Sequence, residues 1–91
     1  MFEWDRHNLR KIRAHRISRE EVEQVLTDDP VLIIAMDIEG EARFVYYGET
    51  GAGRPVGAVL AERGDSLRVV TAYDLDAEQR RDYLRMRIQG A

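Results

Sequence analysis

The 91-residue sequence contains no cysteine, which excludes disulfides, cysteine-ligated zinc sites and thiol catalysis. It also lacks a long apolar run. The longest, Val31–Met36, has the length of a strand, whereas a membrane-spanning helix needs roughly 18 apolar residues. The N-terminal segment Met1–Asp5 is acidic and has no apolar core, so we expect no signal peptide. Linkers, repeats and low-complexity segments are missing too. These absences predict one cytoplasmic domain over residues 1–91, without membrane contact.

Basic charge is in the minority, since 14 Lys and Arg residues stand against 17 Asp and Glu residues, for a net charge of −3. That total alone disfavours a nucleic-acid partner, because a polyanion prefers a positive surface. The charge is unevenly distributed, however. Residues 6–19 hold six basic residues and no acid, and a second basic group follows at Arg80, Arg81, Arg85 and Arg87. The distribution therefore leaves RNA open as a target.

Capping signals predict three helices. Ser18-x-x-Glu21 is a capping box, and Asp5 and Asp76 are suitable N-caps. The predicted helices cover about residues 6–15, 18–26 and 76–87. We expect the apolar residues of the third helix to face inward: Ala77, Tyr83, Leu84 and Ile88.

Strand-like segments fill the middle of the sequence, at about residues 31–36, 43–48, 54–62 and 66–73. The links between the members of each pair are too short for a parallel crossover, so the pairing should be antiparallel. Phe2–Trp4 alternates as a short edge strand would. The order predicts an α+β fold: two N-terminal helices, a four-stranded antiparallel meander and a C-terminal helix, with the helices against one face of the sheet.

Three polar residues, Asn8, Lys11 and His15, should project from one face of the first helix. Partial desolvation beside Leu9 and Ile12 could tune an ammonium and an imidazole for acid–base work. The alternative is structural: Asn8 and His15 hydrogen-bond at the helix ends while Lys11 is solvated.

A glycine-rich segment, Gly48–Arg54, follows the second strand-like segment. It does not match a nucleotide-binding loop, because the chain continues as a strand and not as a helix. A flexible hairpin loop accounts for the glycines. Arg54, beside a glycine hinge, either binds phosphate through its planar fork or is solvated.

Arg68 lies in the middle of an apolar strand, where alternation places it on the same face as Val70 and Ala72. A charge at such a position is costly unless it is paired or functional. The structural alternative is a salt bridge to one of three acids, Glu49, Glu62 or Asp74.

Metal and cofactor signals are missing. His7 and His15 have no third ligand at a suitable spacing, and no Ser-His-Asp order with a nucleophile elbow is present. Aromatic residues such as Trp4 and Tyr73 could stack on bases, although single aromatics on strands are more often core residues. We therefore expect neither a metal nor a cofactor.

Several segments together resemble the BrnT family, toxins of type II toxin–antitoxin operons. They are Phe2-Glu3-Trp4-Asp5, Asn8-x-x-Lys11-Ile12-x-x-His15-x-Ile17-Ser18 and Glu20–Glu23, followed by Gly48-Glu49-Thr50, Gly53-Arg54, Arg68–Ala72, Glu78, Arg81 and Tyr83. The resemblance implies a fold like that of RelE-type ribonuclease toxins, metal-independent RNA cleavage that inhibits translation, and neutralisation by a DNA-binding antitoxin of the BrnA kind.

The resemblance also implies an active site. It places the catalytic residues at Lys11, Glu49, Arg54 and Arg68, and it implicates Trp4. RNA cleavage needs a base, an acid and cations that stabilise the phosphorane. Glu49 or His15 could be the base, Lys11 the acid or charge stabiliser, and the two arginines the phosphate clamp. We expect Trp4, Asn8 and His15 to contact the substrate, Trp4 by stacking on a base.

The sequence departs from the family pattern at two places. Residue 16 is arginine where glycine is common, and Tyr73-Asp74 replaces an arginine-rich segment, which lowers the local potential. The alternative function is a non-catalytic protein- or RNA-binding module with the same fold, a diverged and inactive toxin homologue.

Overall fold

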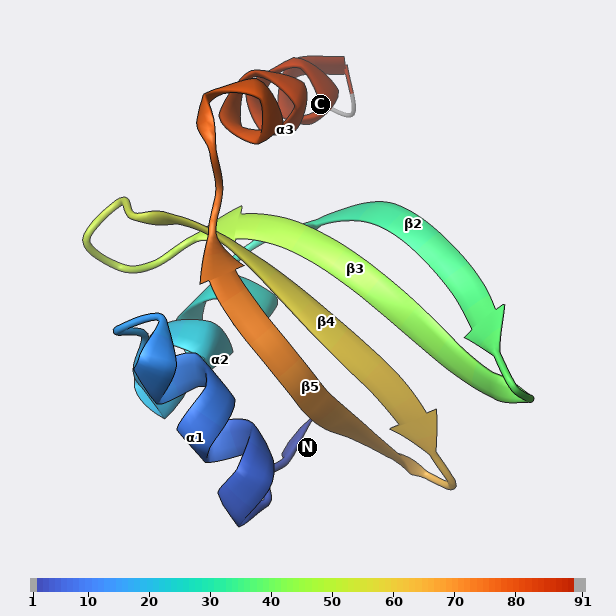
Figure 1. The fold of residues 1–91 in the computed structure, drawn as a ribbon. Helices are drawn as coiled ribbons and strands as arrows, with labels where there is room; N and C mark the ends of the chain where they lie inside the picture. The colour runs from blue at the N-terminus through green and yellow to red at the C-terminus, as the bar shows by residue number, and fades with distance from the viewer. Residues whose placement is uncertain (1, 90–91) are drawn as a thin grey trace.

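The computed structural model describes residues 2–89, which form three helices and five strands (Figure 1). In chain order these are β1 (Phe2–Glu3), α1 (Arg6–Ala14), α2 (Arg19–Thr27), β2 (Val31–Ile38), β3 (Glu41–Glu49), β4 (Pro55–Arg63), β5 (Ser66–Asp74) and α3 (Ala77–Gln89). The predicted α+β class is confirmed. No helix within residues 2–89 is long and apolar enough to cross a membrane.

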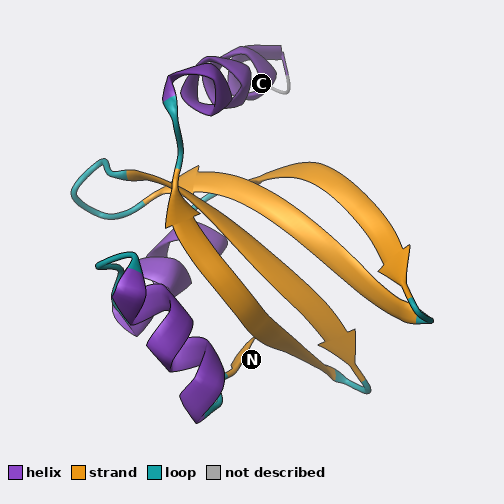
Figure 2. Cartoon of the chain, viewed as in Figure 1, coloured by secondary structure: helices purple, strands orange, loops and turns teal. Residues whose placement is uncertain are grey.

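The sheet has five strands in the order β1-β5-β4-β3-β2 and is mixed, so the predicted four-stranded antiparallel sheet is wrong in detail (Figure 2). The four long strands do form an antiparallel meander. The fifth strand, β1, pairs in parallel with β5, through Phe2 with Leu67 and Glu3 with Arg68. Most of the chain connects β1 to β5, so no short turn restricts the direction in which they pair.

A β-bulge in β5 changes which side chains share a face. Val59 pairs with Thr71, but Leu60 pairs with Val69, so Val70 is an extra residue in the ladder. Strict alternation therefore fails at Val70. Val69 and Ala72 both point into the core, and Arg68 lies on the opposite face from Ala72, which corrects the sequence-based expectation.

The main core lies between the sheet and the pair α1 and α2, which Figure 1 shows side by side next to β5. Gly48 is required there, because an added Cβ would lie 2.9 Å from the Cγ1 atom of Val25. The buried members of this core are Ile12, Ile17, Val22, Val25, Val56, Ala58, Leu60, Val69 and Ala72.

The third helix does not share that face of the sheet, so the expectation that all helices cover one face is wrong. Its buried residue Tyr83 packs with Tyr47 and Leu75. Tyr47 lies between Tyr46 and Gly48, which face the main core, so it must point to the other side. Of the four apolar residues predicted to face inward, only Tyr83 is buried; Ala77 is exposed, and Leu84 and Ile88 are 53% and 77% exposed.

Candidate active site

The C-terminal end of α1 is closed by a Schellman motif. The N–H of Ile17 donates to the carbonyl of Ile12, and that of Arg16 to the carbonyl of Arg13. Ile12 and Ile17 are both buried and supply the hydrophobic contact of the motif. Arg16 occupies the left-handed position, with φ of +57°. A glycine is favoured at such a position, so Arg16 adopts a backbone conformation that residues with a side chain rarely take.

Arg54 connects this helix end to two other elements. Its Nη1 donates to the carbonyl oxygen of Arg16 at 2.8 Å and to Oε2 of Glu21 at 3.4 Å. Its Nη2 donates to the carbonyl of His15 at 3.3 Å and to Asp74 at 2.9 Å, and its Nε donates to Asp74 at 2.7 Å. A guanidinium has five N–H donors, so these bonds occupy all of them. No donor of Arg54 is left for a phosphate.

Arg54 and the carboxylates of Glu21 and Asp74 stabilise one another's charged forms. Hydrogen bonds from Arg54 lower the pKa of Asp74, and the nearby His15 contributes in the same direction. The pKa of Glu21 is lowered first by the backbone N–H of Ser18, in the capping box of α2, and then by the Ser18 hydroxyl and Arg54. The cation also lies at the C-terminal end of α1, where the helix dipole favours positive charge.

The loop between β3 and β4 holds Arg54 in place and is not a flexible hinge. The backbone N–H groups of Ala52 and Arg54 donate to the hydroxyl of Thr50, which is 4% exposed. The N–H of Gly53 donates to the Thr50 carbonyl, and that of Gly51 to Gln24 on α2. The amides of residues 51–54 are therefore all engaged within the protein and leave no cradle for phosphate.

Lys11 on α1 and His15, the C-cap residue of that helix, are four residues apart and are both exposed. Lys11 is one of four exposed basic residues of α1, with Arg6, Arg10 and Arg13; the three arginines share one side of the helix, and Lys11 projects from another. Within residues 2–89, none of these four side chains lies within 4.0 Å of a carboxylate. These exposed cations are consequently available to an anion.

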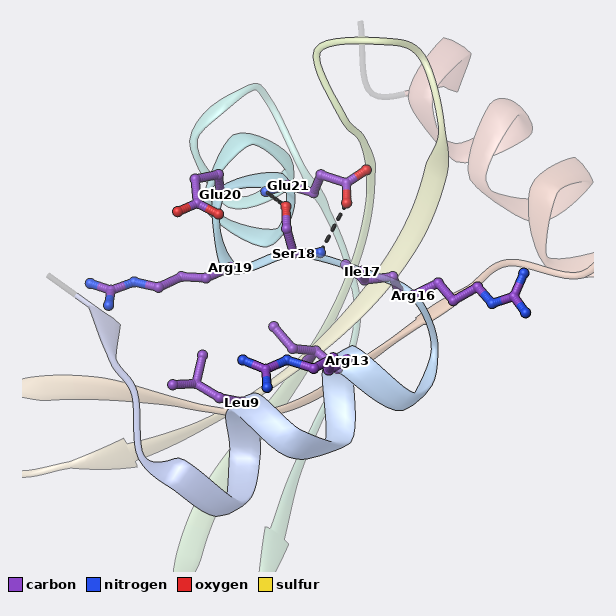
Figure 3. A pocket seen from close by; sticks show the side chains of 9 residues that line it. Leu9, Arg13, Arg16, Ile17, Ser18, Arg19, Glu20 and Glu21 are labelled. Carbon is purple, nitrogen blue, oxygen red and sulfur yellow. Dashed lines mark hydrogen bonds between the residues drawn. The ribbon is translucent and has the colours of Figure 1, made fainter.

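A hollow of about 490 Å³ separates α1 from the first turn of α2. Figure 3 shows Leu9 and Arg13 on α1 below Ser18 and Arg19, with the capping-box bonds between Ser18 and Glu21 at the top. The hollow joins apolar side chains to charges of both signs.

Trp4 and Asn8 have internal partners. The Trp4 indole donates to Glu23 at 2.8 Å, and the Arg19 guanidinium lies 5.8 Å from the ring centroid. Asn8 is 3% exposed and donates to the Asp5 side chain, from its backbone at 2.8 Å and from Nδ2 at 3.2 Å. These contacts fix the start of α1 against α2.

Glu49 faces α3. Its Oε1 accepts from Arg87 at 2.9 Å and from the Tyr83 hydroxyl at 3.3 Å, and Arg87 also donates to that hydroxyl at 2.9 Å. Burial raises the pKa of Tyr83. The carboxylate of Glu49 thus holds the C-terminal helix to the end of β3.

Arg68 lies on the face of the sheet opposite α1 and α2, in one row with Ala61 and Arg43. It pairs with Glu41 at 3.4 Å, and Glu41 also pairs with Arg43 at 3.1 Å. None of the predicted partners, Glu49, Glu62 and Asp74, is used. Two arginines share one carboxylate, and the buried Nε of Arg68 has no hydrogen-bond partner within residues 2–89.

The sequence-predicted site residues therefore fall into separate places. His15 and Arg54 are in direct contact, and Lys11 is one helical turn away. Glu49, Arg68, Trp4 and Asn8 contact other groups. Sequence reasoning missed Glu21 as a partner of Arg54, and Arg43 and Glu41 beside Arg68. No local sequence signal could have indicated Arg43, because it shares a row with Arg68 only through the pairing of β3, β4 and β5.

Metal-ligating side chains do not cluster in the described part of the chain. Residues 2–89 contain no group of three or more His, Cys, Asp or Glu side chains placed to hold a metal ion.

Comparison with known proteins places the chain in a family. No curated protein sequence matches it at a significant level. A family model described as "Ribonuclease toxin, BrnT, of type II toxin-antitoxin system" matches residues 4–79, which run from Trp4 through all the long strands into the first turn of α3. The match covers most of the 91 residues. This chain belongs to the BrnT family of ribonuclease toxins of type II toxin–antitoxin systems.

Proposed function

We propose that this protein is an endoribonuclease that cleaves RNA without a metal ion and thereby inhibits translation, with its reacting groups at the C-terminal half of α1. One observation carries the proposal. Lys11 and His15 are exposed one turn apart, beside a helix end that Arg54 fixes, on a helix whose basic residues are not paired with acids. Exposed cations that are not paired with acids are what a phosphate backbone requires.

The proposed chemistry needs only side chains of this chain. The imidazole of His15 takes the proton of the ribose 2′-hydroxyl as its oxygen attacks phosphorus. The bond from phosphorus to the 5′-oxygen breaks, and Lys11 donates a proton to the departing oxygen and stabilises the charge of the phosphorane. The products are a 2′,3′-cyclic phosphate and a 5′-hydroxyl, with no net change in oxidation state.

Arg54 has a positioning role in this proposal. All five of its donors are used within the protein, so it sets the location of the His15 backbone and touches no substrate. Arg68 provides a second phosphate contact on the open face of the sheet, where Arg43 and Arg68 together exceed the single charge of Glu41. Glu49 holds α3 in place.

The proposed protein partner is a DNA-binding antitoxin of the BrnA kind. Family membership supplies the antitoxin, because type II systems neutralise the toxin with a protein. Its DNA-binding character is the finer part of the proposal and is tested by mobility shift of operator DNA with the purified complex.

The decisive experiment compares RNA cleavage by the wild type with that by His15→Ala and Lys11→Ala. A general base contributes about 10²–10⁴-fold, so His15→Ala should lose at least about 10²-fold in rate. Arg63→Ala, at an exposed arginine that ends β4, is the matched control and should cleave like the wild type. Reactions with EDTA, and with and without ribosomes, test metal independence and the site of action. Circular dichroism checks that each variant is folded.

Cleavage by both α1 variants within threefold of the wild-type rate would contradict the assignment of these groups. The Arg68→Ala variant tests the second phosphate contact: because Arg68 lies on the opposite face of the sheet from Lys11 and His15, we expect weaker RNA binding and slower cleavage while the fold is retained. Salt-dependent RNA binding without any product, in the wild type, would favour the alternative of a non-catalytic binding module.

A further inference from the structure

The outward face of α3 carries two large apolar side chains among arginines. Tyr83 is the buried residue of this helix and fixes the side that meets the sheet. On the opposite side Leu84 and Ile88, 53% and 77% exposed, lie one turn apart and form a continuous strip. We name the exposed residues of that side the α3 stripe: Ala77, Arg80, Arg81, Leu84, Arg85 and Ile88.

The α3 stripe is positively charged on a protein whose net charge is −3. Arg80 and Arg81 have no carboxylate within 4.0 Å among residues 2–89, and Arg85 pairs with Asp82 of the same helix. The exposed acid Glu78 lies at the first turn, away from Leu84 and Ile88. The strip of apolar surface is thus bordered by cations, which complements an acidic partner surface.

We propose that the α3 stripe is a docking surface for the antitoxin. The segment that binds it is an acidic amphipathic helix with apolar residues one turn apart, flanked by aspartate or glutamate. Such a helix buries Leu84 and Ile88 while its carboxylates meet Arg80 and Arg81. With 13 residues, α3 is about 20 Å long and accommodates roughly three turns of a partner helix. This inference rests on the antitoxin partner of the proposed function, and not on the cleavage chemistry.

Two observations favour a protein partner over a membrane or a nucleic acid. RNA phosphates gain nothing from Leu84 and Ile88, and a helix that lies on a lipid surface needs a wider apolar face than two large side chains. The stripe also lies almost wholly beyond residue 79, where the family match ends. A docking surface outside the matched region gives this toxin a means to recognise its own antitoxin.

The test is the affinity of the purified antitoxin, the protein encoded in the same operon, for variants of this chain, measured by calorimetry at two salt concentrations. We expect at least tenfold weaker binding for Leu84→Gln and for Arg81→Glu, and a smaller salt dependence for the latter. Leu32→Gln and Arg63→Glu are matched controls, since Leu32 is 44% exposed on β2 and Arg63 is an exposed arginine at the end of β4. Both controls should bind within threefold of the wild type.

Binding of folded Leu84→Gln and Arg81→Glu within threefold of the wild type would overturn the proposal. So would equal weakening by Leu32→Gln, which would place the antitoxin on the sheet edge. Unchanged antitoxin binding together with loss of self-association, or of binding to phosphatidylglycerol vesicles, would assign the stripe to a second copy or to a membrane instead. These measurements need no RNA. Absence of cleavage by the wild type therefore counts against the proposed nuclease alone.

Discussion

Replacing Arg54 with methionine removes the guanidinium but retains much of the aliphatic stem. Two charge-assisted bonds to the carbonyls of His15 and Arg16 are lost, at about 1 kcal/mol each. The pair with Asp74 adds about 0.5 kcal/mol, a low value because that carboxylate is 56% exposed. Glu21, at 3.4 Å, adds little. We expect a loss of about 2 kcal/mol in the free energy of unfolding, or roughly 10 °C in Tm for a domain of this size.

Urea denaturation measures this loss, with the single tryptophan, Trp4, as the fluorescent reporter of the contact between the N-terminal segment and α2. Arg54→Lys should recover less than half of the loss, because an ammonium cannot reach the carbonyls and Asp74 together. Arg63→Met is the control and should change stability by less than about 0.5 kcal/mol. If Arg54→Met also changed the free energy of unfolding by less than about 0.5 kcal/mol, the view that the guanidinium joins α1, α2 and the end of β5 would be refuted.

Three further predictions concern the same framework. Arg54 lowers the pKa of Asp74, so its stabilising effect is present above about pH 4 and is lost as the pH falls through the folded-state pKa. The difference in urea midpoint between the wild type and Arg54→Met should therefore narrow from pH 5 to pH 3, and a constant difference would contradict the electrostatic origin. Arg16→Gly should raise the free energy of unfolding by about 0.5–1 kcal/mol, because φ is +57° there, and a lower thermal midpoint would argue against that reasoning. Gly57→Ala should cost about 1–3 kcal/mol, because the new Cβ would lie 2.7 Å from the Tyr73 ring, and differential scanning calorimetry would disprove the clash by showing an unchanged midpoint.

Local signals predicted the helices well because the interactions that begin them are local. Asp5 accepts from the Asn8 backbone, the Ser18–Glu21 capping box is formed in both directions, and Asp76 and Gln79 bond each other's backbones. Each of these bonds joins residues three apart in the sequence. The short links likewise predicted the antiparallel pairing of the long strands.

Long-range features could not be predicted from the same signals. The bulge at Val70 depends on how β4 and β5 pair. Because of it, Arg68 lies on the face of the sheet opposite the one that alternation predicted. The partner of Arg68 is Glu41, which lies on β3 and is brought close only by the assembled sheet. Lys11 and His15 were expected on one face from spacing alone. Nothing local shows that the carbonyl of His15 is held by Arg54.

The parallel pairing of β1 with β5 has a consequence for folding during synthesis. It joins Phe2 to Leu67, and the junction at Arg54 likewise needs Asp74 from the end of β5. Helix α1 leaves the ribosome before β5, which carries its anchoring partners, has been made. Contacts between residues so far apart in sequence form slowly and late. A nascent chain therefore contains the basic residues of α1 before the segments that anchor this helix have been made. The fold of the toxin forms only after β5 has joined the sheet.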